Sequence, residues 1–217
     1  MCFSATASFA AASVTAAIGI ATVRQVKSPR ELPLASLPLL FAAQQAVEGT
    51  LWLVLPAVNN GRAVATLSLI FLILAKVLWP AYMAPAVLAI EPDPRRRQAL
   101  YAIAVLGGLI SIYMLNRLIE YPQTAAICGQ SIDYGDVGNA VSYQSLLYLL
   151  CACVPLLLSS NRIVQAFGFM VLVGFLVSAY TYFATFVSVW CFFAAADSSL
   201  LYFYFKRSGA RASAERK

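Results

Sequence analysis

The chain consists almost entirely of apolar runs that are long enough to cross a lipid bilayer. Of its 217 residues, 61% are hydrophobic and only 11% are charged, whereas globular domains average about 25% charged residues. A transmembrane helix needs roughly 20 mainly apolar residues, and seven such runs follow one another. The predicted spans are Phe3–Val23, Pro33–Pro56, Ala63–Ile90, Ala99–Leu118, Ala140–Leu158, Ile163–Phe183 and Phe186–Phe205. The sequence therefore predicts an all-α, seven-helix transmembrane bundle.

The positions of the basic residues predict the orientation of this bundle. Twelve of the fifteen Lys and Arg residues fall in the connections and tail on one side, two fall on the other side, and Lys76 lies inside the third run. Because cytoplasmic loops carry an excess of Lys and Arg, we expect the N-terminus outside and the C-terminus in the cytoplasm. We expect residues 1–207 to form one transmembrane domain of a bacterial inner membrane. Residues 208–217 are expected to be a disordered, basic cytoplasmic tail.

The net charge of +6 does not indicate a nucleic-acid partner, because the basic residues follow the rule for membrane orientation. The lipid bilayer is the predicted partner, and the oligomeric state is left open. A retinal-binding receptor would need a lysine in the seventh span, but that span carries Asp197 and has no lysine before Lys206.

Three ionisable residues, Glu48, Lys76 and Asp197, lie inside predicted spans. A charge at the bilayer centre costs at least about 2.5–3.5 kcal/mol on insertion scales, so such residues usually face the protein interior and mark a functional site. Gln44, Glu48 and Trp52 are spaced four residues apart and share one helix face. We expect this face to line a polar cavity in the outer half of the bundle.

Two structural alternatives remain open for these residues. Glu48 could make a polar contact between helices, although such hydrogen bonds average only about 0.6 kcal/mol in membranes. Lys76 and Asp197 could form a buried ion pair, but only if the third and seventh helices are neighbours.

Cys2, Cys128 and Cys191 all lie near the predicted outer surface, and two interpretations of them compete. Two of the three could form a disulfide, because the outer side of a bacterial inner membrane is oxidising. Alternatively, Cys2 and Cys191 could bind zinc together with Glu48, because the first, second and seventh helices of a closed ring are neighbours. The chain has no histidine, the commonest metal ligand, and this weakens the metal interpretation.

Three short motifs carry a resemblance to a known family. They are the opening Met1-Cys2-Phe3-Ser4, the stripe from Gln45 to Glu48 with Trp52, and the pair Trp190-Cys191. The chain resembles an uncharacterised family of small bacterial integral membrane proteins that begin Met-Cys-Phe-Ser. In that family the position of Gln44 is often His, and the resemblance therefore puts a metal site in doubt for this chain. It implies no established activity.

The sequence predicts that the cavity binds a small solute or ion, with Gln44, Glu48, Trp52, Lys76 and Asp197 as binding or pathway residues for transport. The alternative is a membrane-embedded enzyme or metal-binding protein that uses Cys2, Glu48 and Cys191, with zinc as the cofactor.

Overall fold

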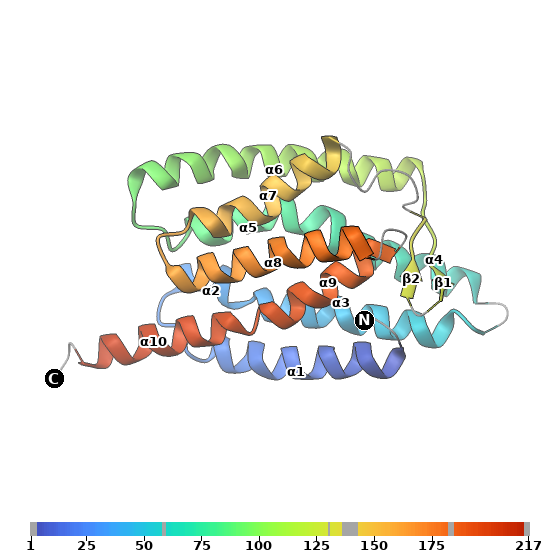
Figure 1. Ribbon diagram of the computed structural model, residues 1–217, viewed down its shortest axis with the longest axis horizontal. Helices are drawn as coiled ribbons and strands as arrows, with labels where there is room; N and C mark the ends of the chain where they lie inside the picture. The colour runs from blue at the N-terminus through green and yellow to red at the C-terminus, as the bar shows by residue number, and fades with distance from the viewer. Residues whose placement is uncertain (1–3, 58–59, 130, 136–142, 182–184, 215–217) are drawn as a thin grey trace.

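The described part of the chain folds into an elongated bundle of helices (Figure 1). The structure is a computed structural model, and it describes residues 4–57, 60–129, 131–135, 143–181 and 185–214. The helices are α1 (Ala5–Val23), η1 (Pro29–Glu31), α2 (Leu32–Ala35), α3 (Leu37–Val54), α4 (Gly61–Leu72), η2 (Ile73–Leu78), α5 (Trp79–Leu88), α6 (Pro94–Glu120), α7 (Tyr143–Leu158), α8 (Arg162–Thr181), α9 (Phe186–Asp197) and α10 (Leu200–Ala214). Two strands, β1 (Ala126–Cys128) and β2 (Ser131–Asp133), form an antiparallel hairpin.

These elements fall into the seven helical segments that the sequence predicts, and the all-α prediction is confirmed apart from the hairpin. By length and composition, five described helices could cross a membrane: Ala5–Val23, Gly61–Leu88, Pro94–Glu120, Arg162–Thr181 and Val187–Arg207. Leu146–Leu158 is a shorter apolar helix. The helix α3 is 18 residues long, but Gln44, Gln45 and Glu48 make it less apolar. The chain is therefore a multi-pass membrane protein, and its orientation stays a prediction.

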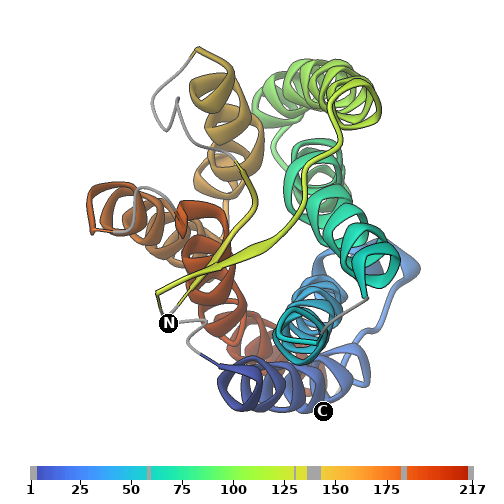
Figure 2. The ribbon, with the colours of Figure 1, turned by 90° about the vertical axis from the view of Figure 1, so that its right-hand side faces the viewer.

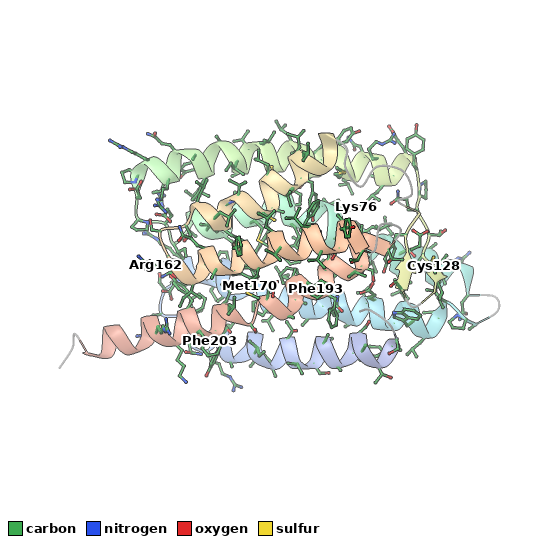
Figure 3. All side chains as sticks on the ribbon, viewed as in Figure 1. Lys76, Cys128, Arg162, Met170, Phe193 and Phe203 are labelled. Carbon is green, nitrogen blue, oxygen red and sulfur yellow. The ribbon has the colours of Figure 1, made fainter. Side chains whose placement is uncertain are left out.

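The two ends of the bundle differ in character. The hairpin lies across one end, over the ends of several helices (Figure 2). Figure 3 shows Cys128 at this hairpin end, Arg162 at the opposite end and Lys76 between them. We call the opposite end the basic end, because it carries Arg95, Arg96 and Arg97 at the start of α6.

A network of hydrogen bonds joins two connections at the basic end. The nearly buried Glu91 carboxylate accepts hydrogen bonds from the backbone N–H and the hydroxyl of Ser160. The guanidinium of Arg96 donates to the carbonyl oxygens of Leu158 and Ser159 at 3.0 and 2.8 Å. The guanidinium of Arg97 caps α5 by donating to the carbonyl of Leu88. Arg96 and Arg97 therefore cap the C-terminal ends of helices, in addition to contributing to the excess of basic residues at this end.

The helix α1 fixes the position of α3. Its buried face carries mostly small residues, and a Cβ added at Gly19 would lie 2.6 Å from the Leu39 side chain of α3. A Cβ added at Gly49 of α3 would lie 3.0 Å from the ring of Phe9. Small residues allow this close approach of membrane helices. The helix α3 also packs against α4 and α9, so its other face looks into the bundle.

The interior of the described part contains two apolar clusters. The cluster toward the basic end includes Trp79, Leu156 and Phe167. The cluster toward the hairpin end, which we call the hairpin cluster, consists of Leu51, Phe71, Leu72, Ala75, Leu118, Ala125, Ile132, Tyr134 and Cys191. Large apolar side chains remain exposed on the outer faces of α6 and α8, where they would contact lipid tails.

The helix α10 reaches Ala214, so the segment that we expected to be a disordered tail starts as a continuation of the last helix. Residues 215–217 lie outside the described part of the chain.

Candidate functional site

Three polar side chains of α3 are completely buried: Gln44, Gln45 and Glu48. Residues three and four positions apart lie on one face of a helix, so all three point into the bundle. Around them lie Trp79 of α5, Tyr134 after β2 and Cys191 of α9. We call these six residues the Glu48 cluster. It lies between the hairpin cluster and the cluster toward the basic end.

In the amide of Gln44, the oxygen accepts a hydrogen bond but the nitrogen donates none to a described residue. The indole N–H of Trp79 donates to Gln44 Oε1 at 3.1 Å, and this contact fixes the orientation of the amide. Gln44 Nε2 is buried and has no hydrogen-bond acceptor among the described residues. Trp52 Nε1, eight residues further along α3, is likewise a buried donor without an acceptor in that part of the chain. Buried donors are seldom left without an acceptor in native proteins, so we expect each of these two to donate to a ligand or a water molecule.

The carboxylate of Glu48 is surrounded by neutral polar groups. Gln45 Nε2 donates to Glu48 Oε2 at 3.4 Å, and the phenol hydroxyl of Tyr134 lies 3.5 Å from Glu48 Oε1. Both contacts are long for hydrogen bonds, which are usually 2.7–3.2 Å for nitrogen donors. The buried thiol of Cys191 lies beside Glu48 and Gln44. This group of acceptors and donors can hold a small polar molecule or a cation.

Tyr134 reaches Glu48 because the hairpin folds back onto the bundle. Its ring stacks on Phe71 of α4, with 4.4 Å between the centroids and an interplanar angle of 4°. Gly135 follows at φ +73°, and its N–H donates to the carboxylate of Asp133. A positive φ is readily adopted only by glycine. This turn follows directly after Tyr134, whose ring is buried in the bundle.

The third helical segment, Gly61–Leu88, contains a π-helix at Ile73–Leu78 that ends two residues before Pro80. Proline lacks an N–H, and its ring clashes with the carbonyl four residues earlier, so a widened turn at this point is physically expected. The hydroxyl of Tyr148 donates to the carbonyl of Ala75 at 2.5 Å, and the hydroxyl of Ser111 donates to that of Val77 at 2.6 Å. Two neighbouring helices thus satisfy carbonyl groups of the widened segment.

The structure brings only some of the predicted site residues together. Gln44, Glu48 and Cys191 belong to one cluster, and Trp52 lies further along the same helix face. Lys76 Nζ instead donates to Gln123 Oε1, in the segment between α6 and β1, at 2.9 Å. Asp197 is the last residue of α9, which packs on α8, α3 and α1 rather than on the third segment.

The cysteine predictions involve Cys2, which lies outside the described residues. Cys128 and Cys191 are both free thiols, the first exposed on β1 and the second buried in α9. The described residues contain no group of three or more His, Cys, Asp or Glu that could hold a metal ion. Of the predicted zinc ligands, the structure places Glu48 and Cys191 near each other.

Sequence reasoning missed Trp79, Gln45 and Tyr134. Trp79 lies one turn after Lys76 in an apolar run, where a tryptophan is an ordinary packing residue. Gln45 stood beside Gln44 in the motif, and its spacing of three residues from Glu48 could have identified it. Tyr134 had no usable signal, since nothing in the sequence between the fourth and fifth predicted spans indicates that this connection folds back into the bundle.

Comparison with models of protein families identifies the family to which the chain belongs. Residues 1–216 match the model of a family of unknown function, DUF6629. The chain belongs to this family, and the resemblance to an uncharacterised family is confirmed at that level. No curated protein and no solved structure matches the chain.

Proposed function

We propose that this member of DUF6629 binds a small solute or ion at the Glu48 cluster and carries it across the membrane. The observation that carries the proposal is the complete burial of the Glu48 carboxyl group within a helix of a multi-pass membrane protein. Burying an ionisable group in the membrane costs several times what one interhelical hydrogen bond returns. One structural hydrogen bond between helices would therefore not offset the free-energy cost of burying Glu48.

The chemistry of the cluster indicates what it would bind. The Glu48 oxygens accept hydrogen bonds or a positive charge, whereas Gln44 Nε2 and Trp52 Nε1 are buried donors without an acceptor in the described part. These three groups are spaced along one face of α3. The site therefore suits a small cation with its water, or a polar solute that has both donor and acceptor groups.

Two interrupted helices support transport rather than binding alone. The seventh segment breaks at Ser198–Ser199, directly after Asp197, where the backbone N–H groups of Ser199 and Leu201 donate to carbonyls three residues earlier. The third segment widens into the π-helix that contains Lys76. Discontinuous membrane helices recur at the substrate and ion sites of transporters, and π-bulges are frequent at functional sites.

Flux into reconstituted vesicles tests this proposal. Purified protein in liposomes would be assayed separately for uptake of protons, Na⁺ and K⁺, with the wild type beside Glu48→Gln. We expect the wild type to carry at least one of these cations, and the variant to fall to the level of empty vesicles. Glu120→Gln is the matched control, because Glu120 is exposed at the end of α6 and should leave flux unchanged. Equal flux for the wild type and Glu48→Gln would contradict the proposal.

The proximity of Glu48 and Cys191 in one cluster favours one alternative, a Cys/Glu metal site or enzyme. A catalytic zinc site usually has three protein ligands and an open position, so it would also need Cys2 or another residue. Metal analysis of the purified protein, wild type beside Cys191→Ser, tests this alternative. Near-stoichiometric zinc that is lost in the variant would support it, and an equal metal content in both proteins would contradict it.

A further inference from the structure

The hairpin is attached to the bundle in an asymmetric way. The three residues of β1 are exposed, whereas Ser131 and Ile132 of β2 are buried. Loops normally run over the protein surface. Here Ile132 and Tyr134 belong to the same apolar cluster as Cys191, and β2 packs against α9. Because Tyr134 reaches Glu48, the hairpin covers the hairpin-end side of the Glu48 cluster; Figure 2 shows the two strands lying across this end of the bundle.

Three polar contacts tie this segment to the helices beneath it. Gln123 accepts a hydrogen bond from Lys76 of η2. The backbone N–H of Ala125 donates to Ser68 Oγ of α4 at 2.9 Å. The Tyr134 hydroxyl meets Glu48 of α3. Each contact has a side chain on at least one side, and each could be exchanged for water at modest net cost. A segment held in this way can lift while the helices stay in place.

The third contact ends on the proposed binding group itself. Tyr134 places its hydroxyl against one oxygen of the Glu48 carboxylate, so a ligand that binds this oxygen from the hairpin end competes with Tyr134. The turn at Gly135 supplies a backbone position next to Tyr134 that can change conformation easily.

We infer that the hairpin is a lid over the Glu48 cluster, that Tyr134 is the positioning residue that closes it, and that the ligand reaches Glu48 from the hairpin end. This inference rests on the proposed function only in taking Glu48 as the binding group. Opening moves Tyr134 away from Glu48 and exposes the Cys191 side of the cluster. Closure returns the phenol hydroxyl to the carboxylate.

The native Cys191 thiol provides a direct probe of lid opening. Cys191 is buried under the hairpin, so N-ethylmaleimide reaches it only when the hairpin lifts. The full-length protein in detergent would be labelled over time, and peptide mass spectrometry would follow Cys191 and Cys153 separately. Cys153 is buried in the cluster toward the basic end and serves as the internal reference.

The test variant is Ser68→Ala with Tyr134→Phe, which removes two attachments but keeps the apolar packing of the hairpin. We expect Cys191 labelling to become about ten-fold faster, because two side-chain hydrogen bonds of typical net strength are lost. Labelling of Cys153 should not change. Ile127→Ala is the matched control, since Ile127 is exposed on β1 and makes none of the three attachments. Its Cys191 labelling should equal that of the wild type.

Two outcomes would overturn the lid. One is unchanged Cys191 labelling in the double variant, and the other is an equal rise at Cys191 and Cys153, which indicates general loosening. In a second variant, Ser68→Cys with Ala125→Cys, a disulfide can join the segment to α4. The oxidised form should label more slowly at Cys191, and reduction should restore the rate. Unchanged labelling in a confirmed disulfide form also overturns the lid. Labelling does not depend on flux. If labelling responds but Glu48→Gln leaves cation flux intact, the proposed function fails and the lid stands.

Discussion

At the scale of single residues, the Gln44 side chain shows how one contact decides what a site can bind. The indole N–H of Trp79 occupies the amide oxygen, so the amide nitrogen is the group left available to a ligand. Without Trp79 the amide could turn over and offer its oxygen instead. Trp79 itself is held in place by stacking on Phe41, with 4.1 Å between ring centroids. The donor character of the site therefore depends on a residue that does not need to touch the ligand.

A double-mutant cycle tests this pairing. Trp79→Phe leaves Gln44 Oε1 buried without its donor, and we expect a loss of about 1–3 kcal/mol in the free energy of unfolding. Gln44→Met alone leaves the Trp79 N–H unpaired and should cost a similar amount. When both partners become apolar, the penalty for an unpaired group disappears, so the double variant should lose less than the sum of the two single variants. The free energy of unfolding in detergent is measured for the wild type, the two single variants and the double variant. Strictly additive losses would contradict the pairing.

The sequence could identify only those site residues whose relation follows from a regular period. Gln44 and Glu48 share a helix face because they are four residues apart, and Cys191 joins them because α9 packs beside α3. The sequence analysis also singled out Lys76 and Asp197, but span order does not determine which side chains meet. The partner of Lys76, Gln123, lies in a connection with no regular period. Contacts made by such segments need the folded structure.

At the scale of elements, the third segment combines a proline effect with close helix packing. The segment contains a π-helix that ends two residues before Pro80, and proline removes a backbone N–H and crowds the preceding turn. The same region of the segment packs tightly on α6. A Cβ added at Gly107 of α6 would lie 2.1 Å from the carbonyl oxygen of Pro80. This distance is far inside van der Waals contact, and the backbone atom cannot move aside as a flexible side chain could.

Adjacent glycines in α6 give a matched test of this packing. Gly107→Ala forces α6 away from the third segment, and we expect a loss of about 1–3 kcal/mol in stability from overpacking. Gly108→Ala meets nothing within 4 Å and should be neutral or stabilise the helix by up to about 1 kcal/mol. Thermal unfolding of both variants in one detergent makes the comparison. Equal stability of the two variants would show that α6 and the third segment do not pack as closely as described.

The hairpin is the element that the sequence did not predict. Its strands have only three residues each, too few to show an alternating pattern, and Gly129 and Gly135 around them read as an ordinary loop. The cause is tertiary, because Ile132 and Tyr134 are buried only when α4 and α9 are already in place.

At the scale of the whole molecule, the chain places its charged and polar groups according to depth. Apolar side chains cover the outer faces of α6 and α8, while in the described part the buried carboxyl and amide side chains lie in the Glu48 cluster and, with Glu91, at the basic end. The spans were predictable because hydrocarbon thickness fixes their length regardless of sequence detail. The order around the ring was also predictable in part, since α1 packs on both α3 and the last segment. The Glu48 cluster consequently lies where the first, second and seventh segments meet, beneath the hairpin.

The orientation of the bundle completes this arrangement and can be measured with native groups. If the charge bias sets topology, the hairpin end faces outward, and the exposed Cys128 thiol should react with a membrane-impermeant maleimide in intact cells. Pro92→Cys places a thiol at an exposed position in the connection at the basic end, and it should react only after the cells are permeabilised. Cys128→Ser is the control for background labelling, and peptide mass spectrometry assigns each label. The reverse pattern would put the lid and its ligand on the cytoplasmic side, and transport would then begin from inside the cell.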